Sequence, residues 1–330
     1  MAERLTHSKR GAFLNCPRYY YNRHERHLTP RVQKAGRRRG AAFGDAIFAV
    51  ADSEIPALDR DTDTLAEVVS ASVAASYAEA SPSTQDEADE LELEQVKIRQ
   101  MAYSYVLRYG VERGKREITF DLPLINPSTG RSSRTFRRAG KIDGLLSLGD
   151  GRWRVIEDKF VGQIQKAMID RLPLDAQSCE YVDALLQLGL EAEIAYRHTL
   201  NPTSAPKLIG TGANRRRETL DEYAWRLAGD VEARPEHYFD QQILQFPQDR
   251  LDDYRRGRWG TARKILDARL LAKHIGWQEA FPMNPSRCWE YGGCEFIPLC
   301  TRGDEALDLY EVEPDNPELG KEQDAEYNTA

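Results

Sequence analysis

The sequence lacks any run of eighteen apolar residues, so it contains no candidate membrane-spanning helix. Its first ten residues, MAERLTHSKR, lack the apolar core of a secretion signal, and we therefore expect a cytoplasmic protein with no membrane partner. Five cysteines in a chain that is not expected to be secreted argue against a disulfide framework. The 330 residues are 41% hydrophobic and 30% charged, as in ordinary globular proteins, and are enough for a full core.

Charge is distributed unevenly between the two ends of the chain. Residues 1–39 contain eleven Lys or Arg and two Glu, a local charge of +9, whereas residues 304–330 contain ten acidic residues and one lysine, a local charge of −9. Basic clusters with interleaved aromatic residues are typical of proteins that bind a phosphate-rich partner. The alternative is a solvated basic helix without a partner. We expect the acidic tail to be disordered.

The spacing of apolar residues predicts helices towards both ends and strands between them. The predicted helices are 6–27 (capped by Ser8 and interrupted at Cys16-Pro17), 40–51, 61–80, 91–110, 174–190, 218–233 and 248–274. The predicted strands are 117–124, 136–148, 153–160, 192–200 and 238–246. Residues 81–90 are polar and predict a mobile connection. The chain thus divides into a helical N-terminal region (1–110), an α/β core (111–246), a C-terminal helix with a cysteine-rich region (247–303), and the tail (304–330).

A predicted β-hairpin at residues 136–160 carries the most informative side chains. Its turn is Gly-Asp-Gly at 149–151, which suits the positive φ angles of tight hairpins. Glu157 and Lys159 are two residues apart and therefore project from one face of their strand, where Asp143 of the neighbouring strand can meet them. Two carboxylates and a lysine can hold a hard divalent cation and stabilise a charged transition state. The alternative is a cross-strand salt bridge.

The helix that follows the hairpin contains Gln177 and Tyr181. Their spacing of four residues places both on one helical face. The Gln amide and the Tyr hydroxyl can each bond a phosphate or a base edge beside the metal. The alternative is that Tyr181 packs in the core and Gln177 is solvated.

Three cysteines near the C-terminus fall at equal spacing, Cys288, Cys294 and Cys300, and Cys16 is available near the N-terminus. Four thiolates can hold a 4Fe-4S cluster or a zinc ion. Zinc sites usually use closer pairs, which favours iron–sulfur here, and buried structural thiols are the remaining alternative. Cys179 lies in an amphipathic helix and is interpreted as a core thiol.

The order of these motifs resembles the PD-(D/E)XK nuclease superfamily, in its RecB-like branch, which includes AddB-type helicase-nucleases and CRISPR-associated adaptation nucleases with an iron–sulfur cluster. The matching segments are SKRGAFLNCPRYYY, GKIDG, VIEDKF, QSCEY and the cysteine triplet. The resemblance implies a restriction-endonuclease-like mixed sheet flanked by helices, with helical N- and C-terminal extensions joined by the cysteine cluster.

The resemblance also implies a role for each site residue. Asp143, Glu157 and the backbone carbonyl of Asp158 would bind Mg²⁺ or Mn²⁺. Lys159 would position the attacking water, Gln177 and Tyr181 would match the Gln-x-x-x-Tyr motif, and Cys16, Cys288, Cys294 and Cys300 would ligate the cluster. The implied activity is that of a single-strand or end-acting DNA exonuclease, with a helicase or a recombination or adaptation protein as partner.

Two positions depart from the branch. Its metal-binding His is replaced by Gly44, and Asp45 is the adjacent candidate, at a helical phase that differs by about 100°. The small hydroxyl residue that often follows the motif lysine is Phe160. These departures leave open an alternative function, a catalytically inactive DNA-binding module of the same fold.

Overall fold

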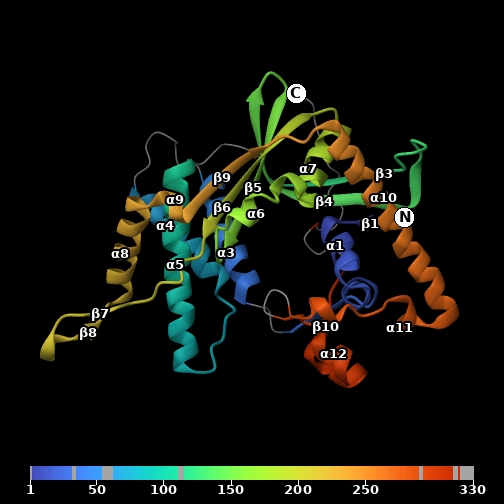
Figure 1. The fold of residues 1–330 in the computed structure, drawn as a ribbon. Coiled ribbons are helices and arrows are strands. Elements are labelled where there is room, and N and C mark those ends of the chain that lie inside the picture. Colours follow the sequence, from blue (N-terminus) through green and yellow to red (C-terminus); the bar gives the residue numbers. More distant parts are fainter. Residues whose placement is uncertain are drawn as a thin grey trace.

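A six-stranded mixed sheet forms the centre of the molecule (Figure 1). The structure is a computed structural model that describes residues 2–31, 35–53, 62–110, 115–289, 293–314 and 319. The strands of this sheet are β1 (Glu3–Leu5), β3 (Lys115–Ile125), β4 (Ser132–Gly149), β5 (Arg152–Val161), β6 (Glu191–Leu200) and β9 (Phe239–Leu244). Their order is β1-β4-β5-β6-β9, with β3 also pairing with β4. The β4–β5 hairpin turns through Gly149, Asp150 and Gly151, all at positive φ, as its sequence predicts.

The sheet contains a fork along one edge of β4. Strand β3 pairs antiparallel with nearly the whole of β4, so β1 and β5 share the opposite edge. There β1 pairs in parallel with residues 136–138, and β5 pairs antiparallel with residues 144–149. Within the described chain, residues 139–143 have no strand partner on this edge. The fork therefore opens at Asp143.

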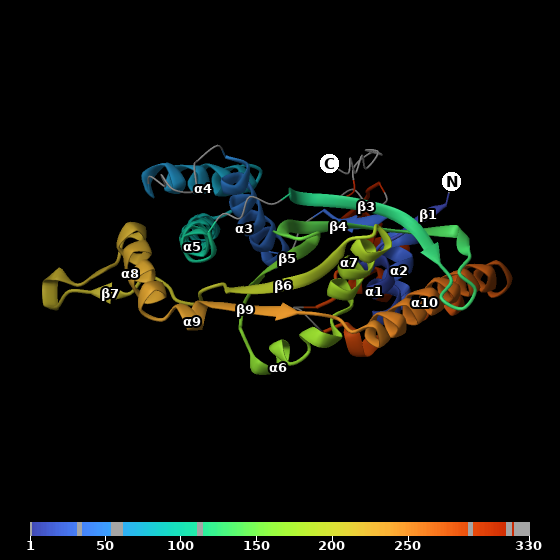
Figure 2. The same cartoon turned by 90° about the horizontal axis from the view of Figure 1, so that it is seen from above.

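Helices cover both faces of the sheet (Figure 2). Helices α1 (His7–Asn15), α7 (Ala176–Gln187) and α10 (Gln248–Ile275) lie on one face, where α7 and α10 pack over Val155 and Leu145. Helices α3 (Ala35–Asp52) and α5 (Gln85–Tyr109) cover the other face, and α4 (Thr62–Ser76) and α8 (Leu220–Ala233) pack against them. A helical layer on each face of a mixed sheet confirms the predicted restriction-endonuclease-like class.

The two ends of the chain meet in a small lobe beside α1. It contains β2 (Leu28–Pro30), which pairs antiparallel with β10 (Tyr310–Val312), and its core includes Phe296 and Leu299. The other short helices are α2 (Pro17–Tyr20), the π-helix Tyr21–Glu25, α6 (Lys166–Ile169), α9 (Pro235–Tyr238), α11 (Trp277–Ala280) and α12 (Ile297–Arg302), and β7 (Leu208–Ile209) with β8 (Arg216–Arg217) forms a separate hairpin. No helix in the described ranges combines the length and apolarity that a membrane span requires.

Some predicted boundaries differ from the structure for local reasons. Helix α5 begins at Gln85, inside the segment predicted to be mobile, because Thr84 caps it by accepting a hydrogen bond from the Glu87 N–H at 3.2 Å. Thr6, not Ser8, caps α1. The N-terminal region is not purely helical, since β1 joins the sheet. The expected disordered tail does not begin at Asp304, because residues 303–312 form a 3₁₀ helix and β10; residues 315–318 and 320–330 lie outside the described part.

Candidate active site

Asp143, Glu157 and Lys159 come together on the face of the sheet that α7 covers. Glu157 and Lys159 alternate along β5 and share this face, and Lys159 Nζ forms an ion pair with the Glu157 carboxylate. Gly144 and Ile156 are the pair nearest the fork, so Asp143 and Glu157 follow one residue further along each strand. The structure therefore brings these three residues together as their spacing predicts.

Burial dominates the electrostatics of this group. Glu157 is fully buried, and its pKa is raised to about 8, because burial and the nearby Asp143 carboxylate together outweigh the opposing charge of Lys159. Burial also raises the pKa of Asp143. The pKa of Lys159 is raised despite its burial, because Glu157 and Asp143 favour the ammonium form. We conclude that Lys159 stays charged and that Glu157 carries a proton near neutral pH unless a cation replaces it.

The backbone of Asp158 also lies at the fork, next to Asp143. Because β5 has separated from β4, the backbone N–H of Asp158 donates a hydrogen bond to the Asp143 carboxylate. In a strand the N–H and C=O of one residue point to the same edge, so the carbonyl of Asp158 also faces this side. The Asp158 side chain projects to the opposite face, where it accepts a hydrogen bond from Tyr105 Oη at 2.5 Å. Arg197 donates to the same hydroxyl at 3.0 Å and thereby joins β6 to α5.

Gln177 and Tyr181 extend the group from α7. Gln177 Nε2 donates to the Tyr181 hydroxyl at 2.8 Å, and Gln177 Oε1 accepts from Lys159 Nζ at 3.4 Å. Tyr181 is 5% exposed, and burial raises its pKa, so its hydroxyl keeps its proton. Tyr181 therefore packs in the core while its hydroxyl contacts Gln177, and its contact with a phosphate or a base edge stays a prediction.

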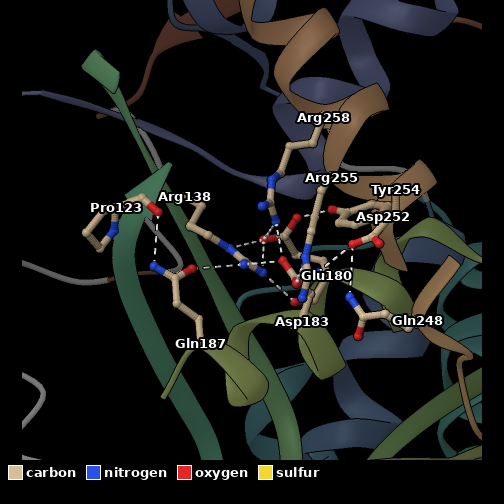
Figure 3. A network of polar contacts seen from close by, with 10 residues as sticks. All are labelled: Pro123, Arg138, Glu180, Asp183, Gln187, Gln248, Asp252, Tyr254, Arg255 and Arg258. Atoms are coloured by element: carbon tan, nitrogen blue, oxygen red, sulfur yellow. Dashed lines mark hydrogen bonds and ion pairs between the residues drawn. The ribbon is translucent and has the colours of Figure 1, made fainter. Parts of the chain in front are cut away.

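A buried network of charges fixes α7 against β4 and α10 (Figure 3). Arg138 of β4 is 1% exposed and donates to the Glu180 carboxylate at 2.8 Å, to the Glu180 carbonyl at 2.7 Å, and to Asp183. Arg258 of α10 donates to Asp183 at 2.8 Å, and Arg255 donates to it at 2.6 Å. Because Glu180 precedes Tyr181 directly, this network determines where Tyr181 lies.

Several residues beside the site were not predicted from the sequence. Tyr196 and His198 of β6 pair in register with Glu157 and Lys159, and the charge of Lys159 acts on both of them. His198 is 1% exposed, and its Nδ1 lies 3.2 Å from Asp240. Tyr196 and His198 are two residues apart, so the sequence indicates that they share one face of their strand. Only the pairing of β5 with β6 shows that this face is the one that carries Glu157 and Lys159.

His7 is a further residue near the site. It begins α1 directly after β1, which ends beside Arg138 and the fork. Burial lowers its pKa, the charges of Arg10 and Lys159 lower it further, and those of Glu180 and Asp175 oppose them. Its Nδ1 has no hydrogen-bond partner in the described structure. Asp175 itself caps α7, accepting from the Ser178 N–H at 2.7 Å.

Asp45 lies apart from this group. It is on an exposed part of α3 and accepts a hydrogen bond from Ser76 of α4 at 3.0 Å. No contact among the described residues joins it to Asp143 or Glu157.

Phe160, the residue after the motif lysine, has a structural role here. Its ring stacks on that of Phe43 of α3, with 4.7 Å between the ring centroids, and holds that helix against the sheet.

The four cysteines outside the core gather where the two ends of the chain meet. Cys16, Cys288 and Cys294 line a cavity of about 390 Å³. The Asn284 N–H donates to Cys16 Sγ at 3.4 Å, which ties α1 to the C-terminal segment. Burial raises the pKa of Cys300 to about 11, and the other three cysteines all act on it. Cys179 is fully buried in the core, as interpreted.

The carboxylate group at Asp143 and Glu157 and the group of peripheral cysteines differ in how they could hold a metal. Among the described residues, no three His, Cys, Asp or Glu side chains are grouped closely enough to hold one. Mg²⁺ needs only one or two carboxylates, with carbonyl and water oxygens. The Glu157 carboxylate is buried with Lys159 as its ion-pair partner and with no other hydrogen-bond partner in the described structure, so this carboxylate beside Asp143 fits a divalent cation. Three of the four peripheral thiols line one cavity, and thiols are donors that suit either a zinc ion or an iron–sulfur cluster.

The chain as a whole matches a known family. The sequence pattern of the PD-(D/E)XK nuclease superfamily matches residues 4–301, a range that contains the fork, α7 and all four peripheral cysteines. No curated protein matches the chain significantly. The match covers most of the chain, and the mixed sheet with its flanking helices agrees with it. The chain therefore belongs to the PD-(D/E)XK nuclease superfamily, whose substrates are nucleic acids.

Proposed function

We propose that this protein is a Mg²⁺- or Mn²⁺-dependent deoxyribonuclease that hydrolyses phosphodiester bonds at Asp143, Glu157 and Lys159. The observation that carries the proposal is the Glu157 carboxylate, which is fully buried beside Asp143 and, apart from its ion pair with Lys159, has no hydrogen-bond partner in the described structure. A purely structural carboxylate that is fully buried would be expected to have hydrogen-bond partners for both of its oxygens. A bound divalent cation compensates such a charge and gives the carboxylate a role.

Each residue of the group has a distinct part in this proposal. Asp143, Glu157 and the Asp158 carbonyl hold the cation, which, when bound, polarises a phosphoryl oxygen and lowers the pKa of a water molecule. Lys159 keeps a fixed positive charge beside them and stabilises the charge that develops on the phosphoryl group. Asp45 stays outside the proposed ligand set because its side chain is exposed and bonded to Ser76.

Gln177 and Tyr181 orient the lysine and the substrate. Gln177 accepts from Lys159 and donates to Tyr181, which fixes the lysine and leaves the Tyr181 proton available for a phosphate or a base edge. We extend the proposal to single strands or free ends as substrate, to an exonuclease mode, and to a helicase or adaptation partner. The support for that extension is the RecB-like order of the motifs.

The four peripheral cysteines are proposed to hold a 4Fe-4S cluster. Support comes from three of the thiols lining one cavity and from the equal spacing of Cys288, Cys294 and Cys300. A link through Cys16 closes a loop of more than 270 residues and removes conformational entropy from the unfolded chain. Zinc is the alternative. Metal analysis of anaerobically purified protein separates the two, because only the cluster gives iron, sulfide and absorbance near ~400 nm.

An inactive DNA-binding module is the second candidate function, and Gly44 favours it. A side chain fits at Gly44, since an added Cβ meets no atom within 4 Å. The test compares wild type with Gly44→His, using labelled single-stranded DNA and Mn²⁺. Cleavage by wild type supports the nuclease. DNA binding without cleavage by wild type, together with cleavage by Gly44→His, supports the module.

A further inference from the structure

A basic hairpin projects from the body between β6 and α8. Figures 1 and 2 both show β7 and β8 extending away from the molecule at the end opposite α10. Residues 201–217, which we call the basic arm, contain four Lys or Arg and no Asp or Glu. In a chain whose formal charge is −7, this is a concentrated positive segment.

Three of the four cations on the basic arm are available to a ligand. Arg216 is occupied, because its guanidinium donates to both carboxylate oxygens of Glu222 at 2.6 and 2.5 Å. Lys207, Arg215 and Arg217 are exposed, and none of them forms an ion pair within the described part of the chain. Their side chains are therefore not held by an ion pair, and within the described chain only Lys207 has a carboxylate, Glu218, on which its charge acts.

The basic arm is a braced element. Glu218 accepts from the Lys207 N–H at 2.8 Å and from Arg226 Nε at 2.8 Å, so it joins the base of the arm to α8. Arg226 also donates to the Ala205 carbonyl at 3.0 Å. The turn is tight, since Gly210 has φ +81° and a Cβ there would lie 2.3 Å from the Asn214 carbonyl oxygen. Cations on a braced support lose little conformational freedom when they bind.

A hollow lies at the base of the basic arm. Its volume is about 560 Å³, and Lys207, Arg226, Arg234 and His237 line it together with apolar residues. This volume lies in the range of ligand-binding pockets. Trp225 of α8 is 84% exposed. It lies one helical turn before Gly229, which lines the hollow, so the two residues share one side of α8.

The basic arm begins where the catalytic strand ends. Lys159 of β5 pairs in register with His198 of β6, and the last pair of these parallel strands is Val161 with Leu200. Leu200 also lines the hollow, and the arm follows it directly. The hollow and the arm therefore lie beyond the end of β5 and β6 that is nearest to Lys159. Because α8 packs on the face opposite to α7, a strand of nucleic acid that leaves the active site reaches them by passing around this end of the sheet.

We propose that the basic arm and its hollow bind the phosphate backbone of single-stranded DNA that continues beyond the active site, and that Trp225 stacks on one of its bases. The inference rests on the proposed nuclease function for the direction of the strand. The binding itself depends only on charge, exposure and an aromatic surface, which together are the usual means of holding a single strand without sequence preference.

The test is DNA binding by the full-length protein without cleavage. A fluorescein-labelled oligothymidine of about 30 nucleotides is titrated in EDTA at several salt concentrations, with fluorescence anisotropy as the readout. The arm variant is Lys207→Gln/Arg215→Gln/Arg217→Gln. The matched control, Arg263→Gln/Lys264→Gln/Lys273→Gln, removes three cations of α10 at the other end that are likewise exposed and form no ion pair with any residue that the structure describes. Thermal melting by circular dichroism confirms that both variants fold.

We expect the arm variant to bind about tenfold more weakly than the control near ~0.1 M salt, and the slope of log affinity against log salt to fall by about two, since each phosphate contact contributes ~0.7. Trp225→Ala is expected to weaken binding by about fivefold or more. Equal affinities and equal slopes for the arm variant and the control would overturn the proposal, as would a wild type that does not bind the oligonucleotide.

Cleavage assays separate this proposal from the nuclease proposal. If wild type cleaves and the arm variant binds DNA like the control, the nuclease stands and the arm proposal fails. If no variant cleaves but the arm variant alone loses affinity, the arm is established as a binding surface and the nuclease proposal fails.

Discussion

Removal of Arg138 is expected to cost more stability than any exposed ion pair. Its guanidinium donates to Glu180, Asp183 and Gln187 from a site that is 1% exposed. Breaking a buried pair by deleting one partner typically costs about 3–5 kcal/mol, because the remaining charge stays buried. Arg258 continues to contact both acids at 3.5 and 2.8 Å. We therefore expect Arg138→Met to lose about 3 kcal/mol of unfolding free energy, at the lower end of that range.

The pH dependence of the unfolding free energy gives a second measure of how strongly this network stabilises the fold. Burial alone would raise the pKa of Glu180, but Arg138, Arg258 and Arg10 outweigh it and lower the pKa from 4.5 to about 2. A lowered pKa means that this carboxylate stabilises the fold above pH 4.5 and that the stabilisation is lost as the pH falls towards 2. The shift corresponds to about 3 kcal/mol. In Arg138→Met the loss of stability between pH 4.5 and 2 is expected to be smaller, because the charge that lowers the Glu180 pKa most is absent.

The assay is urea unfolding followed by tryptophan fluorescence at several pH values. The control is Arg256→Met, which breaks an exposed pair with Asp253 on α10 and should cost less than about 0.5 kcal/mol. Because α7 carries Tyr181, Arg138→Met should also raise KM for DNA. A loss below about 1 kcal/mol, or one no larger than that of Arg256→Met, would refute the reasoning that the buried network holds α7 in place.

Three further predictions concern the sites themselves. In a thermal-shift assay, the stabilisation of wild type by Mn²⁺ should grow with pH, because Glu157, with a pKa of about 8, must release its proton before it binds the cation. The affinity for Mn²⁺ should rise about tenfold per pH unit up to pH 8, and Glu157→Gln should abolish the effect. Asp45→Ala should leave Mn²⁺ binding unchanged in the same assay, since its carboxylate bonds Ser76; a lost Mn²⁺ response would place it in the site. Cys16→Ser should lose iron and absorbance near ~400 nm on purification; full iron retention would remove Cys16 from the proposed ligand set.

Local patterns in the sequence were sufficient for the β4–β5 hairpin and for α7. The Gly-Asp-Gly turn and the alternation of Val155, Glu157 and Lys159 determine which side chains share a face, and the spacing of Gln177 and Tyr181 does the same on the helix. These features depend on residues close in sequence. The structure places all of them as the periodicities predict.

Features that depend on tertiary pairing could not be predicted in this way. β1 has only three residues, and nothing in Glu3–Leu5 indicates that it pairs with β4 beside the fork. The register of β5 with β6, which brings His198 to Lys159, follows from packing over the whole sheet. Arg138 and Glu180 are of residue types that usually lie at the surface, and they can be buried only because they neutralise each other.

The most direct test of the account is digestion of end-labelled single-stranded DNA with Mn²⁺ by anaerobically purified wild type and by Lys159→Ala. The matched control is Arg256→Gln, which removes a positive charge from an exposed position on α10. We predict cleavage by wild type and by Arg256→Gln, and loss of cleavage in Lys159→Ala with DNA binding retained. Cleavage by Lys159→Ala at the wild-type rate would contradict the assignment of the active site to Asp143, Glu157 and Lys159.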